Sequence, residues 1–186
     1  MIVFKLSQKL LLLALPLTFF SCENKVNNDI PMPEELNKPK ELTQEESIAL
    51  SRFWTSDEAY KIKRFVERNG WSAIRSESGL YCSVYNKKPE ARIAQPGDLV
   101  LVNYKVRLIN ADTTLCYESE AGKPQEILIE MDNVEAGLHE ALTYLREGES
   151  AYIVLPHYLA HGLAGDLDKI PPLSPVLYEL DLVAIK

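Results

Sequence analysis

Apolar residues in the first half of the chain follow the period of an α-helix between residues 56 and 69. The stripe that they form consists of Ala59, Ile62, Phe65 and Val66. Such spacing predicts an amphipathic helix that packs on a domain or a partner. Asn69-Gly70 follows the last apolar residue, and this pair favours the end of a helix.

Two helix-start signals precede this stripe. Thr43 with Glu46, and Thr55 with Glu58, each have the spacing of a capping box. In that motif a hydroxyl and a carboxylate satisfy the backbone N–H groups at the start of a helix. We therefore predict two helical pieces between residues 43 and 69.

From residue 79 the period changes to two, the repeat of a strand that is buried on one face. Shorter strands are predicted at 79–85, 113–118, 126–130 and 151–156, and from about 175 to the end. In the long run 99–109, one face carries Val100, Val102, Tyr104, Val106 and Leu108. A helix is predicted where the apolar positions are Val134, Leu138, Ala141, Leu142 and Leu145.

The order of these elements predicts an α+β fold. We expect an antiparallel sheet of five to six strands wrapped around one helix, with an N-terminal helical extension. Residues 43–78 are assigned to the extension and residues 79–186 to the domain. The polar, proline-bearing stretch 22–42 has no hydrophobic period and is predicted to be a flexible tether.

The first 21 residues have the pattern of an export signal. Lys5 and Lys9 form a short basic head, and a largely apolar run then ends just before Cys22. This run is too short to span a bilayer, so a signal peptide over 1–21 is predicted. LTFFSC (17–22) resembles a bacterial lipobox, which implies lipidation of Cys22. Secretion with an unmodified Cys22 is the alternative, since Phe19 and Phe20 are bulkier than the usual residues.

Charge and cysteine content narrow the classes of partner. Removal of residues 1–21 takes two lysines and changes the formal net charge from −7 to −9, which gives no attraction for nucleic acid. No later apolar stretch is long enough to cross a membrane, so lipid is the expected anchor. Cys82 and Cys116 remain, and the sequence leaves open whether they form a disulfide or two separate buried thiols.

Five segments carry a recognisable order. They are PGDLVLVNYKVRL (96–108), GKPQEILI (122–129), VEAGLHEAL (134–142), EGESAYIVLP (147–156) and IPPLSPVLYELDLVAI (170–185). In this order they resemble the FKBP-type peptidyl-prolyl cis-trans isomerases over about 79–186. The lipobox and LAHGLAGDLDKIPP (159–172) resemble a lipoprotein subgroup linked to gliding motility in Bacteroidetes.

The resemblance implies catalysis by a dry pocket, with neither a metal nor another cofactor. A twisted X–Pro amide has lost resonance and is less polar than the planar forms, so apolar walls favour it. By position, Tyr104 and His161 are the expected catalytic residues, which hold a substrate carbonyl. The expected pocket residues are Tyr117, Val134, Glu135, Leu138, Ile170 and Tyr178, with Val134 and Glu135 acting through their backbone.

Several positions depart from the family pattern. His161 replaces a tyrosine, Leu138 replaces the tryptophan of the pocket floor, and Gln125 replaces a phenylalanine of the wall. Asp166 falls at the position of a loop histidine. Tyr117 stands in place of the pocket aspartate. These changes keep a second interpretation open, in which the domain binds proline-containing segments without useful catalysis.

The histidines and aspartates between residues 157 and 168 raise the alternative of a metal site. His157 and His161 are four residues apart and are followed by Asp166 and Asp168, but the loop contains two glycines, so regular helical ligand spacing is not expected.

The family resemblance and the predicted lipid anchor together imply the partners. They are proline-containing exported polypeptides, a membrane bound through the lipid anchor, and other proteins of an envelope complex. The expected location is the cell envelope at the outer membrane.

Overall fold

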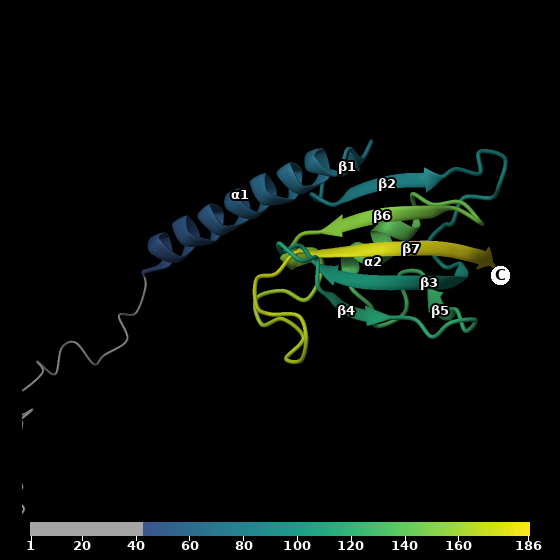
Figure 1. Ribbon diagram of the computed structural model, residues 1–186. Coiled ribbons are helices and arrows are strands. Elements are labelled where there is room, and N and C mark those ends of the chain that lie inside the picture. Colours follow the sequence, from purple (N-terminus) through teal and green to yellow (C-terminus); the bar gives the residue numbers. More distant parts are fainter. Residues whose placement is uncertain (1–42) are drawn as a thin grey trace, which may run out of the picture. The chain divides into compact units, whose positions relative to one another are not determined.

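The computed structural model describes residues 43–186 (Figure 1). The predicted signal peptide, the lipidation site Cys22 and the tether 22–42 lie outside the described residues. No helix in the described range is long and apolar enough to cross a membrane.

The N-terminal helix α1 runs without a break over Gln44–Arg68. Thr43 accepts a hydrogen bond from the Glu46 N–H while the Glu46 carboxylate accepts from the Thr43 N–H, which confirms the first capping box. The second predicted start is wrong, because the Thr55 hydroxyl donates to the Ser51 carbonyl inside the helix. The helix ends at Asn69, as predicted.

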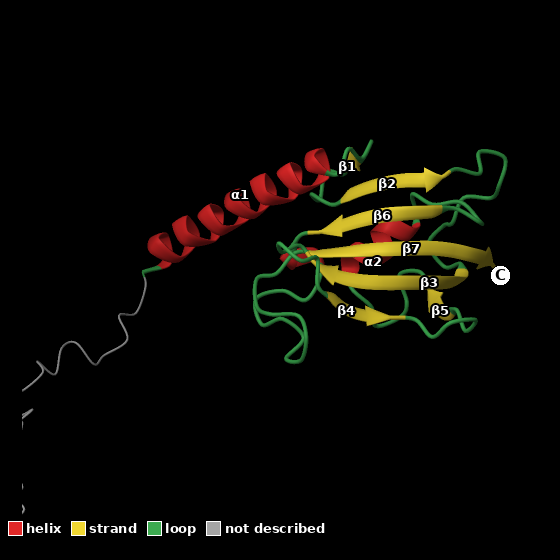
Figure 2. Ribbon diagram, in the orientation of Figure 1, coloured by secondary structure: helices red, strands yellow, loops and turns green. Residues whose placement is uncertain are grey.

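One antiparallel sheet forms the centre of the described part (Figure 2). Its strands are β1 (Ile74–Arg75), β2 (Tyr81–Asn86), β3 (Leu99–Leu108), β4 (Leu115–Glu118), β5 (Gln125–Leu128), β6 (Ser150–Leu155) and β7 (Val176–Ile185). The strand order is β1-β2-β6-β7-β3-β4, and β5 pairs with the first half of β3. The α+β class and the antiparallel sheet are confirmed, and β1, which was not predicted, brings the strands of the described region to seven.

The main core lies between one face of the sheet and helix α2 (Ala136–Leu142). The alternation predicted for β3 holds, since Val100, Val102 and Val106 are buried on this face. Gly137 permits the close approach of α2, because a Cβ there would lie 2.8 Å from both the Leu155 side chain and the Leu159 carbonyl oxygen. The start of α2 therefore packs directly on the Leu155 side chain of β6 and on the backbone of the short 3-10 helix His157–Leu159.

A smaller cluster lies on the opposite face of the sheet. It joins one side of α1 to β6 and β7 through Ile62, Phe65, Val66, Val154 and Leu177. Val154 and Leu177 alternate along their strands with residues of the main core, so they point to the other face. Only the C-terminal half of α1 is buried in this way, and the residues before Asp57 are exposed. Cys82 and Cys116 are separate, buried free thiols.

Candidate functional site

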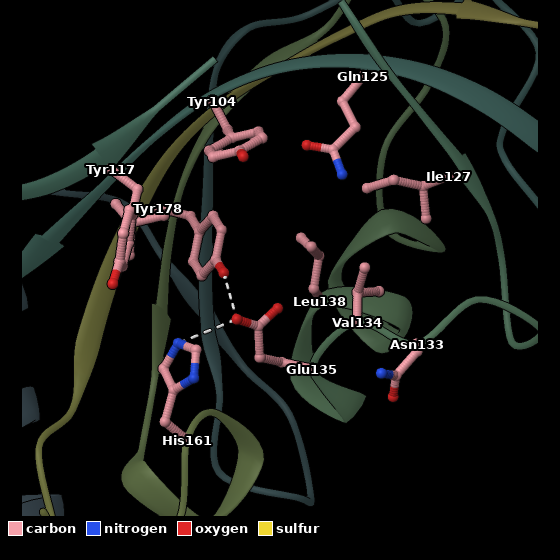
Figure 3. Close-up of a pocket in the computed structure, with 11 residues that line it drawn as sticks. Tyr104, Tyr117, Gln125, Ile127, Asn133, Val134, Glu135, Leu138, His161 and Tyr178 are labelled. Atoms are coloured by element: carbon pink, nitrogen blue, oxygen red, sulfur yellow. Dashed lines mark hydrogen bonds and ion pairs between the residues drawn. The ribbon is translucent and has the colours of Figure 1, made fainter. Parts of the chain in front are cut away.

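A cavity of about 350 Å³ opens between α2, the inner face of the sheet and the loop 156–175 (Figure 3). Its walls combine apolar and polar side chains from β3, β4, β5, β7, the start of α2 and the loop. The lining residues are Tyr104, Val106, Tyr117, Gln125, Ile127, Asn133, Val134, Glu135, Leu138, His161 and Tyr178. A volume of this size lies at the lower end of the range of about 300–1,000 Å³ for ligand sites.

The Glu135 side chain occupies one side of the cavity. Its Oε1 accepts a hydrogen bond from the Tyr178 hydroxyl at 2.9 Å and lies 3.0 Å from His161 Nε2 (Figure 3). Glu135 is the N-cap residue of α2, yet its side chain caps no N–H of that helix. Burial and the neighbouring carboxylate raise the pKa of Tyr178 well above its usual range, so its hydroxyl stays protonated as a donor.

Tyr117 forms the adjoining part of the rim. Its hydroxyl donates a short hydrogen bond to Asp166 Oδ2 and lies 3.2 Å from Asp168 Oδ2. Asp166 Oδ1 accepts from the N–H groups of Asp168 and Ile170. Desolvation acts to raise the pKa of Asp166, but these hydrogen bonds outweigh it and lower the value to about 2. Asp166 is therefore a fixed anion at the edge of the cavity.

The loop 156–175 is anchored at its start by a buried glutamate. Glu58 of α1 accepts from the His157 N–H at 2.8 Å with Oε1 and lies 2.8 Å from His157 Nδ1 with Oε2. Both side chains are only 8% exposed. Gly165 shapes the far part of the same loop with a φ of +71°, and a Cβ there would overlap the Ile170 carbonyl oxygen. Helix α1 thus helps to place the loop that carries His161 and Asp166.

Comparison with known proteins identifies the architecture. The family model for FKBP-type peptidyl-prolyl cis-trans isomerases matches residues 90–183, which is more than half of the chain. The chain belongs to this family. The matched range contains both the sheet strands and the loop that enclose the cavity.

Individual relatives agree with this assignment. The chain is 28% identical over 125 residues to the FKBP-type isomerase FkpA of Buchnera aphidicola subsp. Baizongia pistaciae, covering 67% of this chain and 47% of that protein. It is 32% identical over 114 residues to the macrophage infectivity potentiator of Trypanosoma cruzi (61% and 57%). It is 36% identical over 111 residues to the FKBP-type 22 kDa isomerase of Escherichia coli (59% and 52%). The chain thus spans about half the length of these relatives.

Most of the predicted pocket residues of this FKBP-type domain come together. Tyr104, Tyr117, Val134, Glu135, Leu138, His161 and Tyr178 all line the cavity. Ile170 does not line it, because its side chain is 2% exposed and packs in the main core behind the wall. The catalytic roles of Tyr104 and His161 stay predictions. His161 Nε2, the expected donor to a substrate carbonyl, contacts Glu135 in this structure.

Sequence reasoning missed three features of the site. Val106 and Ile127 are wall residues, and the signal that could have found Val106 is the alternation of its strand, which placed it on the same face as Tyr104. The Glu135 side chain lies in the cavity, although only its backbone was expected to face a ligand. Asn133 also lines the cavity, and no local pattern marked it. Among the residues from 43 onward, no group of three or more His, Cys, Asp or Glu could hold a metal ion.

Proposed function

We propose that the chain is a peptidyl-prolyl cis-trans isomerase that acts on exported polypeptides. The observation that supports this most directly is the cavity itself, whose floor is Leu138 and whose walls include Ile127 and Val134. The apolar surface that these three residues offer favours the twisted X–Pro amide over the planar amide, because the twisted form is less polar. Rotation about the free amide has a barrier of about 18–20 kcal/mol, so modest differential binding accelerates it.

Tyr104 is the group best placed to orient the substrate. Its ring lies 6.2 Å from that of Tyr178, centroid to centroid, and forms part of the cavity wall. Among the described residues none hydrogen-bonds its hydroxyl, which leaves that O–H as a donor for a substrate carbonyl. In the same proposal His161 holds Glu135, and it reaches the substrate only when that contact opens.

A non-catalytic binding role is the second candidate. The observation that favours it is the polarity of the lining, where Gln125, Asn133 and Glu135 face the same space as the apolar walls. A polar lining stabilises a planar, polar amide as well as it does a twisted one, so it reduces the differential binding that catalysis needs. Such a domain would hold prolyl segments within an envelope complex.

The proposed location is the cell envelope, with a lipid on Cys22 holding the domain at the outer membrane. The lipobox-like LTFFSC and the polar tether 22–42 support this part. The resemblance of residues 159–172 to gliding-motility lipoproteins supports a place in a motility or secretion apparatus. Metabolic labelling with a radioactive fatty acid, using Cys22→Ser as the control, tests the anchor. Label that persists in Cys22→Ser would contradict it.

Prolyl exchange measured by NMR tests the activity. A capped Ala-Leu-Pro-Phe peptide exchanges between cis and trans over tens to hundreds of seconds without a catalyst. The full-length chain should accelerate this exchange, and folded Tyr104→Ala should lose most of the acceleration. Binding of the peptide without any acceleration would instead support the binding role.

A further inference from the structure

The Glu135 carboxylate is an unusual group for an apolar pocket, and its surroundings are well defined. The side chains of Glu135 and His161 are 16% and 22% exposed, so the contact between them is partly screened from water. Tyr178, which donates to the same oxygen, is 3% exposed. Glu135 is therefore held in one orientation, with its carboxyl group directed into the cavity (Figure 3).

Only one of the two Glu135 oxygens is used by the protein. Oε1 meets both Tyr178 and His161. Within residues 43–186, Oε2 has no hydrogen-bond partner. A carboxylate oxygen that is fixed in place and partly desolvated makes stronger charge-assisted hydrogen bonds than one on an open surface. Glu135 Oε2 is thus a preorganised hydrogen-bond acceptor for a donor group of a ligand in the cavity.

Glu135 carries the one carboxylate among the lining residues, and none of these residues is Lys or Arg. Lys169, next to Asp168 on the rim, donates to the Cys116 carbonyl and lies over the Tyr117 ring at 4.7 Å, so its charge is engaged on the Tyr117 side of the site. Asp166 adds a second fixed anion on the Tyr117 side. A ligand beside Glu135 therefore meets negative potential that no lysine or arginine of the wall offsets.

We propose that Glu135 makes the cavity selective for prolyl segments with a Lys or Arg next to the proline, and selective against segments with Asp or Glu there. This rests on the proposed function, because it assumes that the proline ring enters this cavity. A basic side chain lays its methylene groups along the apolar wall while its charged end reaches the carboxylate. An acidic side chain in the same place meets a like charge and loses water without gaining a partner.

Peptide binding to the full-length chain tests the selectivity. Ala-Lys-Pro-Phe, Ala-Leu-Pro-Phe and Ala-Glu-Pro-Phe, capped at both ends, are titrated at pH 8 and followed by NMR. The wild type should bind the lysine peptide at least tenfold more tightly than the glutamate peptide. The ratio should shrink at high salt, since screening weakens charge contacts.

Two variants assign the effect to one carboxylate. Glu135→Gln keeps the shape and an acceptor oxygen for Tyr178 and His161, and it should reduce the lysine-to-glutamate ratio at least fivefold. Glu130→Gln is the matched control. It removes one charge from the segment before α2 at an exposed position outside the cavity lining, and it should leave the ratio unchanged.

The outcomes separate this inference from the proposed function. A leucine peptide that binds and exchanges, together with equal binding of the lysine and glutamate peptides, overturns the selectivity and leaves the isomerase proposal standing. A preference that survives in Glu135→Gln also overturns it. Binding ordered by charge without any accelerated exchange supports the selectivity and removes catalysis. No binding of the lysine peptide at millimolar concentration contradicts both.

Discussion

Two glutamate–histidine pairs connect the loop 156–175 to the rest of the domain, and they differ in how deeply they are buried. Glu58 uses both of its oxygens on His157, one for the backbone N–H and one for the ring, and both side chains are 8% exposed. Glu135 uses a single oxygen for His161 and Tyr178, in a cavity that a ligand can enter. The same two residue types thus form a buried, fully hydrogen-bonded contact at Glu58 and a partly exposed contact at Glu135 that a ligand can reach.

The difference follows from what surrounds each pair. Glu58 belongs to the buried side of α1 that covers the outer face of the sheet, next to Ile62. Glu135 precedes α2 at the mouth of the space between that helix and the inner face. A fully satisfied, buried pair fixes geometry, whereas a partly satisfied one keeps capacity for a ligand. Two predictions test this contrast directly, and two further predictions concern the start of α1 and the carboxylate of Asp166.

Removal of the buried Glu58 carboxylate should have the largest effect on the free energy of unfolding. Glu58→Ala leaves the His157 N–H and ring nitrogen buried without their partner, and each unsatisfied buried polar group costs about 1–3 kcal/mol of unfolding free energy. Glu135→Ala should cost much less, because cavity water can replace the lost acceptor. Urea unfolding followed by tryptophan fluorescence measures both, since Trp71 stacks on Tyr152 at 4.3 Å. Equal costs would contradict the contrast.

Loss of one donor to the open carboxylate should have an intermediate effect. Tyr178→Phe keeps the ring in the core but removes the hydroxyl that binds Glu135. A hydrogen bond to a charged group contributes about 1.5–3 kcal/mol, so the unfolding free energy should fall by that amount. Tyr158→Phe is the control, because its hydroxyl binds the Ser78 carbonyl, it does not line the cavity and its side chain is exposed. A larger loss of unfolding free energy in Tyr158→Phe than in Tyr178→Phe would contradict this role of the Tyr178 hydroxyl.

The exposed N-terminal half of α1 should contribute less to stability than the half that packs on the sheet. Thr43→Ala removes the capping box, and the loss of an N-cap typically costs about 1 kcal/mol. Only the exposed first turns should fray, because the helix is held to the sheet beyond Asp57. Hydrogen exchange should therefore speed up near Glu46 and stay slow near Ile62. Faster exchange along the whole helix would show that the two halves unfold together.

The last prediction concerns the pH dependence of stability at Asp166. Its pKa is about 2 in the folded state, below its ordinary value of 3.8, so the ionised form stabilises the fold. That contribution is complete above about pH 4 and disappears as the pH falls towards 2. The stability difference between wild type and Asp166→Asn should thus be constant from pH 7 to 5 and shrink below pH 4. A difference that grows with acid would give the pKa shift the opposite sign.

Local patterns accounted for a large part of the fold. The alternation along β3 placed Val100, Val102 and Val106 in the core, and the spacing of Thr43 and Glu46 located the start of α1. The same kind of spacing failed at Thr55, since a hydroxyl inside a helix can also bond the carbonyl four residues earlier. A capping pattern therefore locates a start only where the chain before it is not already helical.

The site was less accessible to sequence reasoning, because its contacts join distant residues. Glu58 and His157 are 99 positions apart, and Tyr117 and Asp166 are 49 apart. No local period records such pairs. Motif order brought Tyr104, Leu138 and Tyr178 to one cavity, but the direction of the Glu135 side chain depends on the Tyr178 hydroxyl and the folded loop.

The most direct test of the central claim is prolyl exchange with a charge placed on the cavity floor. Wild type, Leu138→Asp and Leu163→Asp are compared on the Ala-Leu-Pro-Phe peptide, with NMR spectra to confirm folding. Leu138 lines the cavity, whereas Leu163 is 76% exposed on the nearby loop and controls for added charge. Wild type and Leu163→Asp should accelerate exchange equally, and folded Leu138→Asp should not. Undiminished exchange by Leu138→Asp, or none by wild type, would contradict catalysis in this cavity.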